Sequence, residues 1–300
     1  MLKIAYNDTY IHSLPEGHRF PMLKYELLPQ QLLLEGTVEE SNFFNPDKIL
    51  KERVLAIHDA DYYTALCQLQ LDKKAQRKSG FPHNEALIHR EHHIVEGTRK
   101  CTEYALQYGV SMNIAGGTHH AYPDHGEGFC LLNDQAIAAH YLLTSGNAKK
   151  ILIIDLDVHQ GNGTAKIFEN NPAVYTFSMH GANNYPLKKE HSDWDVPLAD
   201  GIGDNEYLYE LEKNLDLVLE KFTPDFLFFQ SGIDIIDNDR LGRLNVSIKG
   251  CKKRDEIVFQ RAKALSLPIV ASMGGGYSQE IKQIIEAHAN TYRTAQHIFF

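Results

Sequence analysis

The sequence predicts a single α/β domain built on a mostly parallel β-sheet with helices on both faces. Two observations carry this prediction. Short apolar runs alternate along the chain with longer helix-like stretches, and strands joined by right-handed helical crossovers form a parallel sheet. The chain of 300 residues is 43% hydrophobic and has no Pro/Ser/Gly-rich linker or repeat, so one domain over residues 1–300 is expected.

The expected elements follow from these two kinds of segment. The apolar runs predict strands, in chain order, at Leu2–Tyr6, Met112–Ala115, Ile151–Leu156, Val174–Ser178, Phe226–Gln230 and Pro268–Ser272. The stretches between them predict helices at Glu91–Tyr108, Asn133–Thr144, Asn205–Lys221, Lys249–Leu265 and Ser278–His297.

Polar residues follow four of the predicted strands. They are Gly116–His120, Asp155–His159, Gln230–Asp234 and Gly274–Tyr277. Folds of this class bind their ligands outside the carboxyl ends of the strands. If the four strands are neighbours in the sheet, the four polar clusters meet in one pocket.

The run Ile151–Ile154 is followed by three candidate metal-site residues, Asp155, Asp157 and His159. Because strand side chains alternate between faces, these three are expected on the same side. With Asp234, the residues Asp157 and His159 would form a set of three ligands with an open position, as in catalytic zinc sites. Two carboxylates and one imidazole suit Zn²⁺ and also accommodate Fe²⁺ or Co²⁺.

Two further strand ends carry candidate catalytic groups. His119 and His120 are adjacent, so both reach one pocket only from an irregular turn, which Gly116–Gly117 permits. A histidine pair near a metal suits proton transfer. Tyr277 follows three glycines, Gly274–Gly276, that allow close backbone approach, and its phenol is a candidate hydrogen-bond donor to an oxyanion.

Composition narrows the class of protein. The net charge of −9 and the absence of a Lys/Arg-dense stripe argue against nucleic-acid binding, and an acidic surface favours cationic substrates. Residues 1–10 lack a signal-peptide core, and no apolar stretch is long enough for a membrane span. The four scattered cysteines predict buried thiols rather than a disulfide framework. A soluble, cytoplasmic protein is expected.

Taken in order, these motifs resemble the zinc-dependent histone deacetylase family, and the small class IV-like members most. The motifs are Gly116–Ala121, Gly128–Asp134, Asp155–Gly163, Ser178–His180, Gly232–Asp234 and Gly274–Tyr277, with Tyr10–Tyr25 as an opening segment. The resemblance covers most of the chain. It implies the arginase/deacetylase fold, with a parallel sheet of about eight strands and helices on both sides.

The resemblance also assigns roles to residues. Asp157, His159 and Asp234 match the family's zinc ligands. His119 and His120 match its tandem histidines. Continuing the same match, Tyr277 corresponds to the carbonyl-polarising tyrosine, and the channel for the lysine stem is lined by Gly128, Phe129, Tyr185 and the backbone of Gly275. Backbone oxygens of Asp155, Asp157 and His159, with Ser178 and Met179, match a structural K⁺ site.

Two residues depart from the family's better-known members. Thr118 stands where those members have Trp, and Asn162 stands where many have Asp. By position, Asp155 pairs with His119 and Asn162 with His120. A carboxylate favours the imidazolium and a neutral amide does not, so His119 is expected to be the charged partner and His120 the general base.

The predicted function is a metal-dependent amide hydrolase that removes acetyl or other acyl groups from lysine side chains of proteins. Acetylated polyamines or other small acylated amines are alternative substrates. A ureohydrolase on the same fold would need more carboxylates for its two manganese ions. A metal-holding module without activity, which only binds acyl-lysine, would be expected to have lost Tyr277 or a histidine, and all are present.

Overall fold

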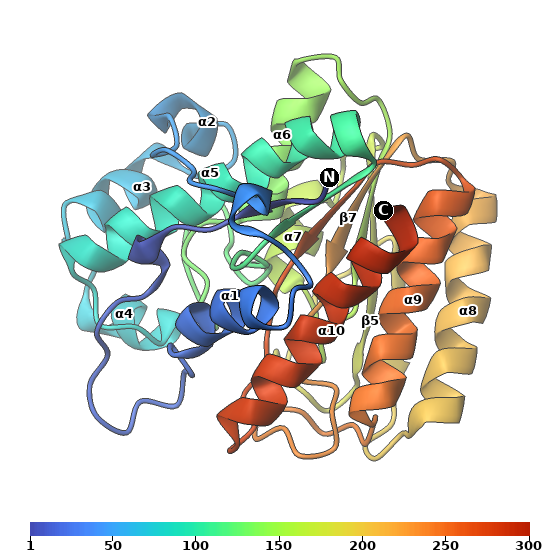
Figure 1. Cartoon of the computed structure of the whole chain (residues 1–300). Coiled ribbons are helices and arrows are strands. Elements are labelled where there is room, and N and C mark those ends of the chain that lie inside the picture. Colours follow the sequence, from blue (N-terminus) through green and yellow to red (C-terminus); the bar gives the residue numbers. More distant parts are fainter.

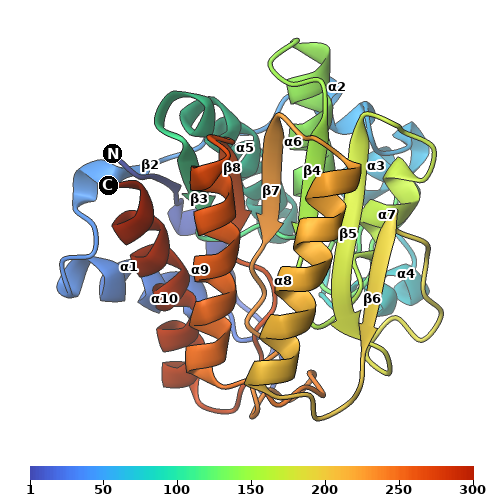
Figure 2. The same cartoon turned by 90° about the vertical axis from the view of Figure 1, so that its right-hand side faces the viewer.

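The computed structural model describes residues 1–300 and contains one parallel sheet of eight strands, as predicted. The strand order is β2-β1-β3-β8-β7-β4-β5-β6 (Figures 1 and 2). The strands are β1 (Lys3–Ala5), β2 (Phe43–Phe44), β3 (Val110–Asn113), β4 (Ile151–Asp155), β5 (Val174–Gly181), β6 (Trp194–Leu198), β7 (Phe226–Gln230) and β8 (Ile269–Ser272).

Helices cover both faces of this sheet. In Figure 2 α8, α9 and α10 stand in front of the strands, while α5 and α6 lie behind them, with α2, α3 and α4 further out. The helices are α1 (Lys24–Leu34), α2 (Lys51–Leu55), α3 (Ala60–Cys67), α4 (Lys73–Ser79), α5 (Glu85–Tyr108), α6 (Asp134–Thr144), α7 (Asn162–Phe168), α8 (Asp204–Lys221), α9 (Ile248–Ala264) and α10 (Ile281–Phe299).

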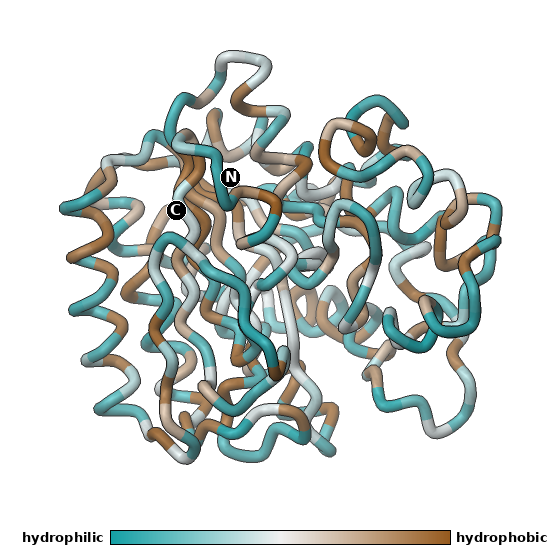
Figure 3. Tube along the Cα trace, turned by 180° about the vertical axis from the view of Figure 1, so that it is seen from behind, coloured by the Kyte–Doolittle hydropathy of each residue, from teal (hydrophilic) through white to brown (hydrophobic).

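The core is divided by the sheet, because alternate strand side chains point to opposite faces. In β4, Leu152 and Ile154 join the larger hydrophobic cluster, while Ile151 and Ile153 join the smaller one beside α6. In Figure 3 several helices alternate between hydrophilic and hydrophobic colour along their turns, as amphipathic helices packed on a sheet do. No helix has the length and apolar character needed to cross a membrane.

The predicted elements differ from the observed ones mainly at their ends, and the helices α1, α2, α3, α4 and α7 were not predicted. Helix α5 begins at Glu85 rather than Glu91, because the Asn84 side chain caps it by accepting a hydrogen bond from the Leu87 amide. The two edge strands, β2 and β6, were not predicted. β2 has only two residues, and β6 contains Pro197, which an edge strand tolerates.

The strand order decides where the polar clusters lie. β3, β8, β7 and β4 are consecutive in the sheet, and all their pairings are parallel. Their carboxyl ends therefore share one edge, and the four polar clusters predicted to follow these strands lie side by side there. This edge carries the candidate site.

Candidate active site

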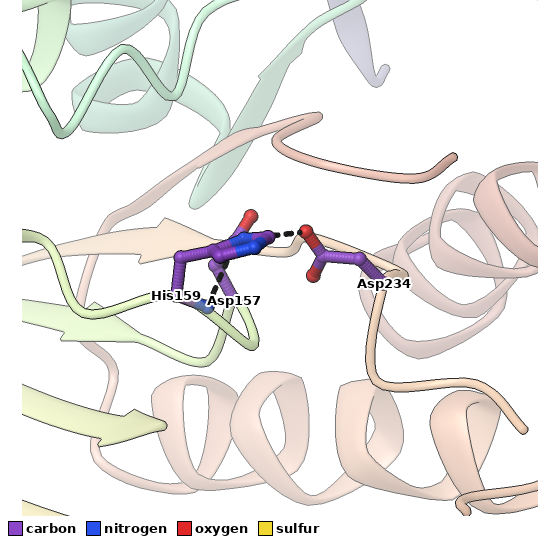
Figure 4. A group of neighbouring side chains, drawn as sticks. All are labelled: Asp157, His159 and Asp234. Carbon is purple, nitrogen blue, oxygen red and sulfur yellow. Dashed lines mark hydrogen bonds and ion pairs between the residues drawn. The ribbon is translucent and has the colours of Figure 1, made fainter. Parts of the chain in front are cut away.

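Three side chains at this edge form a compact candidate metal site. Asp157 and His159 come from the bend after β4, and Asp234 comes from the loop after β7 (Figure 4). All three are buried, and one potential ligand atom from each lies within 4.8 Å of the others. His159 Nδ1 is 3.0 Å from Asp157 Oδ1 and 3.1 Å from Asp234 Oδ2.

Backbone groups hold the two carboxylates. The amide of Gly275 donates to Asp157 Oδ2 at 2.9 Å, and the amide of Val158 donates to Asp234 Oδ1 at 3.0 Å. Position 275 requires glycine, because a Cβ there would lie 2.0 Å from Asp234 Oδ2. The ligand positions are thus set by the loops after three different strands.

The charges of this triad fit a divalent cation. Burial raises the pKa of Asp234 to about 7, with the charge of Asp157 adding to the effect. Burial by itself would lower the pKa of His159, but its hydrogen bonds to Asp157 and Asp234 raise it to about 10. Two buried carboxylates that stabilise a proton this strongly on their neighbour are a favourable environment for a bound cation. The donor set of two oxygens and one nitrogen suits Zn²⁺.

Asp155 meets His119, the partner expected from its position, but it does not share a strand with Asp157 and His159 as strand alternation predicted. β4 ends at Asp155, and Asp157 and His159 lie in the bend that follows, so strand alternation does not place these three residues. Asp155 is not part of the triad. Its Oδ2 instead accepts a hydrogen bond from His119 Nδ1 at 2.7 Å.

The tandem histidines lie on an irregular turn. Gly116 and Gly117 have φ values of 79° and 73°, the left-handed region that favours glycine. The rings of His119 and His120 are 4.1 Å apart between centroids, and both are buried. Thr118 hydrogen-bonds Asp134 through its amide and its hydroxyl, both at 2.8 Å.

The two histidines have different partners. His119 Nδ1 contacts a carboxylate, whereas His120 Nδ1 contacts the amide oxygen of Asn162 at 2.6 Å. Burial by itself would lower the pKa of His119, but the charges of Asp155 and Asp157 raise it to about 9. Burial and the charge of His119 hold the pKa of His120 well below its usual value. His119 is therefore the cationic member of the pair and His120 the neutral one.

Aromatic side chains surround the approach to the triad. The Phe129 ring is 5.8 Å from that of Tyr277, and the Tyr185 ring is 5.1 Å from that of His120. A pocket of about 290 Å³ lies between them and reaches His159. Burial raises the pKa of Tyr277, so its hydroxyl stays protonated and able to donate. Gly128 and Gly275 also line this region.

Basic side chains lie at the mouth of the pocket, although the chain as a whole is acidic. Arg19, Lys78 and Arg243 line it, and no acidic side chain does. Lys78 is paired with Glu127 at 2.7 Å and Arg243 with Asp200 at 3.4 Å. Two of the three cations are thus paired with carboxylates, and the net charge of the chain does not predict how this mouth is charged.

Several residues near the site escaped the sequence analysis. Lys24 and Glu127 are both buried charged residues beside it, and Phe20 packs on Phe129 with ring centroids 5.0 Å apart. Phe20 lay within the opening segment that was recognised. Lys24 lies in a helix and Glu127 in a glycine-rich loop, and neither position carries a local signal of burial.

Three of the residues expected to hold a potassium ion lie in the neighbouring strands β4 and β5. Ser178 of β5 is the register partner of Asp155 of β4, and Met179 follows it. All three residues are buried.

The chain is similar to a known protein family and to several known proteins and structures. The histone deacetylase domain family matches residues 18–292. A protein of Picosynechococcus sp. described as uncharacterized is 40% identical over 296 residues, 99% of each chain. Histone deacetylase 2 of Arabidopsis thaliana is 28% identical over 95% of this chain and 76% of its own length. A crystal structure of an HDAC homolog complexed with SAHA matches with a TM-score of 0.85 at 25% identity, covering 99% of this chain and 84% of that one.

Proposed function

Because the chain belongs to the histone deacetylase family, we propose that it is a zinc-dependent deacylase that removes acetyl or other acyl groups from lysine side chains of proteins. One observation carries this proposal. Asp157 and His159 of the buried triad line one pocket together with the histidine pair and Tyr277, and Asp234 completes the triad beside them. We include residues 1–300 in one catalytic domain, since a single sheet spans them.

Asp157, His159 and Asp234 would hold the zinc ion. When bound, it would lower the pKa of a water molecule and polarise the acyl carbonyl. The same ligands accept Fe²⁺, so the native metal is part of the test. The main chain of Asp155, Asp157 and His159, with Ser178 and Met179, would hold a structural K⁺ ion.

The remaining side chains have separate tasks. His120, the neutral histidine, takes a proton from water through Nε2 and returns it to the leaving amine. The Tyr277 hydroxyl donates a hydrogen bond to the oxygen that gains charge. His119, held cationic by Asp155, stabilises the same charge from its side of the pocket.

Two features of the pocket support the proposal of an acylated lysine over an acetylated polyamine as the substrate. Phe129 and Tyr185 supply walls for a methylene stem, with the backbone of Gly128 and Gly275 beside them. Basic side chains at the mouth, of which Arg19 makes no ion pair, disfavour the free ammonium groups of a polyamine. A peptide backbone brings carbonyl oxygens that these side chains can contact. Acetylated polyamines and other small acylated amines remain the alternative substrates that the assay includes.

The test is turnover of a matched panel with metal analysis. Acetyl-, butyryl- and myristoyl-lysine peptides are compared with acetylspermidine, before and after chelation and after re-addition of Zn²⁺ or Fe²⁺. We expect chelator-sensitive hydrolysis of a lysine peptide, one bound divalent ion per chain, and little hydrolysis of acetylspermidine. Turnover of acetylspermidine above that of every peptide would reject the protein-lysine assignment. If the protein binds one divalent ion per chain and turns over no member of the panel, the assignment as a deacylase is rejected.

A further inference from the structure

A buried carboxylate lies behind the histidine pair and has no part in the roles given above. Glu127 is 4% exposed. Its Oε1 accepts a hydrogen bond from Asn162 Nδ2 at 2.6 Å, and its Oε2 lies 2.7 Å from the ammonium group of Lys78. Asn162 in turn meets His120 Nδ1 through its amide oxygen, also at 2.6 Å. The four side chains form a line from the pocket mouth to the general base.

The charge of Glu127 determines which way the Asn162 amide faces. Burial by itself would raise the pKa of Glu127, but hydrogen bonds from His125, Lys78, Tyr185 and Asn162 hold it well below its usual value. An ionised carboxylate only accepts hydrogen bonds. The NH₂ group of Asn162 must therefore face Glu127, and its carbonyl oxygen must face His120.

The amide oxygen of Asn162 in turn fixes the tautomer of the His120 imidazole. A carbonyl oxygen only accepts, so His120 Nδ1 must carry the hydrogen. In a neutral ring the lone pair is then on Nε2. If the Asn162 amide were flipped, its NH₂ group would donate to Nδ1 of His120, and the ring hydrogen would be on Nε2. Nε2 would then have no lone pair with which to accept a proton.

We propose that Glu127 is a positioning residue that orients the Asn162 amide and thereby keeps His120 in the tautomer that can act as general base. This rests on the function proposed above, in which His120 moves the proton. A histidine paired with Asp needs no such device, because a carboxylate cannot donate in either orientation. A neutral Asn does need it, since its two ends have opposite hydrogen-bonding character.

If Glu127 had only a structural role, its substitution would have a different effect on the kinetic constants. The loop that carries Glu127 is tied to the end of α4 by main-chain bonds, from Gly128 N to Lys78 O at 3.1 Å and from Phe129 N to Ser79 O at 2.8 Å. A side-chain substitution leaves these bonds in place. If Glu127 mattered only through its ion pair with Lys78, loss of either partner would disturb Phe129 and raise KM.

The test first compares three single variants on the substrate that the wild-type protein turns over best. Glu127→Met removes the acceptor at similar side-chain length, and we expect kcat to fall about tenfold with KM within about twofold. Glu127→Gln keeps one acceptor oxygen and should retain more of kcat. Lys78→Met breaks the ion pair but leaves the contact between Glu127 and Asn162, so it should lower kcat less than Glu127→Met.

The decisive measurement is a double-mutant cycle with Asn162→Ala. If Glu127 acts through Asn162, Glu127→Met lowers kcat in the wild-type background and not in the N162A background. Thermal unfolding of the same proteins measures the contact without relying on activity, and it should show the same coupling. Equal losses of kcat in both backgrounds, or a Lys78→Met variant as slow as E127M, would overturn the proposal. A wild-type protein without turnover would instead overturn the proposed function, and this inference with it.

Discussion

The ammonium group of Lys24 lies 3.1 Å from the main-chain carbonyl oxygen of Gly274, and so connects the first helix of the chain to the loop that leads to Tyr277. Lys24 is fully buried, and its Nζ lies over the rings of Phe20, Tyr25 and Tyr277 at 5.4 to 5.7 Å. Burial lowers its pKa to about 8. The loop that leads to Tyr277, the proposed oxyanion donor, is therefore held by a residue 250 positions earlier in the chain.

Replacing this lysine should affect turnover more than stability. Lys24→Met keeps the stem among the three rings but removes the donor to Gly274. We expect kcat to fall about tenfold, because the loop before Tyr277 loses a hydrogen bond made by a charged group. The melting temperature should change by less than about 3 °C, since the cost of burying a cation is removed as well. Lys253→Met on the exposed face of α9 is the control, and equal kcat in the two variants would contradict this prediction.

A methyl group at position 275 should disturb the metal site. In Gly275→Ala the Cβ would meet Asp234 Oδ2 at 2.0 Å and Asp157 Oδ2 at 2.8 Å, so both carboxylates must move. We expect zinc content per chain, measured by mass spectrometry, to fall well below that of the wild type. Gly203→Ala is the matched control, because its nearest neighbour atom is 3.8 Å away and its φ is −101°. Full zinc content in the G275A variant would show that the ligands adapt.

The Tyr277 hydroxyl should matter for the reaction and not for the fold. Tyr277→Phe keeps the ring that packs against Phe129 and removes only the donor. We expect kcat to fall by a factor on the order of 10² to 10³, the usual cost of losing one oxyanion donor, with zinc content unchanged. Tyr209→Phe on the exposed surface of α8 is the control. Near-wild-type turnover in Y277F would remove this residue from the chemistry.

Arg293 of α10 pairs with Glu35, the residue after α1, and with Glu286, and the Glu35 pair makes stability depend on pH. Hydrogen bonds from Arg293 lower the pKa of Glu35 from 4.5 to about 2. Because the folded-state pKa is depressed, the stabilisation is present above pH 4.5 and is lost as the pH falls toward 2. Arg293→Gln should therefore lower the melting temperature by about 2 °C near neutral pH, and the difference from wild type should shrink below pH 4.5. Lys213→Gln, which removes an exposed pair within α8, is the control. A difference that is constant from pH 7 to pH 3 would contradict the assignment to Glu35.

Much of the architecture was predictable because its signals are local. β7 was predicted with its observed bounds, Phe226–Gln230, since a buried parallel strand is an apolar run bounded by turn residues. The prediction was less accurate where a single side chain decides an end, as when Asn84 starts α5. It also failed for β6, whose Asp195 and Pro197 interrupt the apolar pattern at the sheet edge.

By itself, the sequence determined the strands that carry the site, the polar residues that follow them, and the family. The resemblance also predicted the triad and the partners of the two histidines, but only the tertiary structure explains why these side chains meet. Asp234 reaches Asp157 because β7 lies beside β4, and Glu127 reaches Asn162 across 35 positions. Lys24 and Glu127 are surface-type residues that their local sequence does not mark as buried. Burial and contact between distant segments depend on how the strands are ordered and packed, and local periodicity does not specify that order.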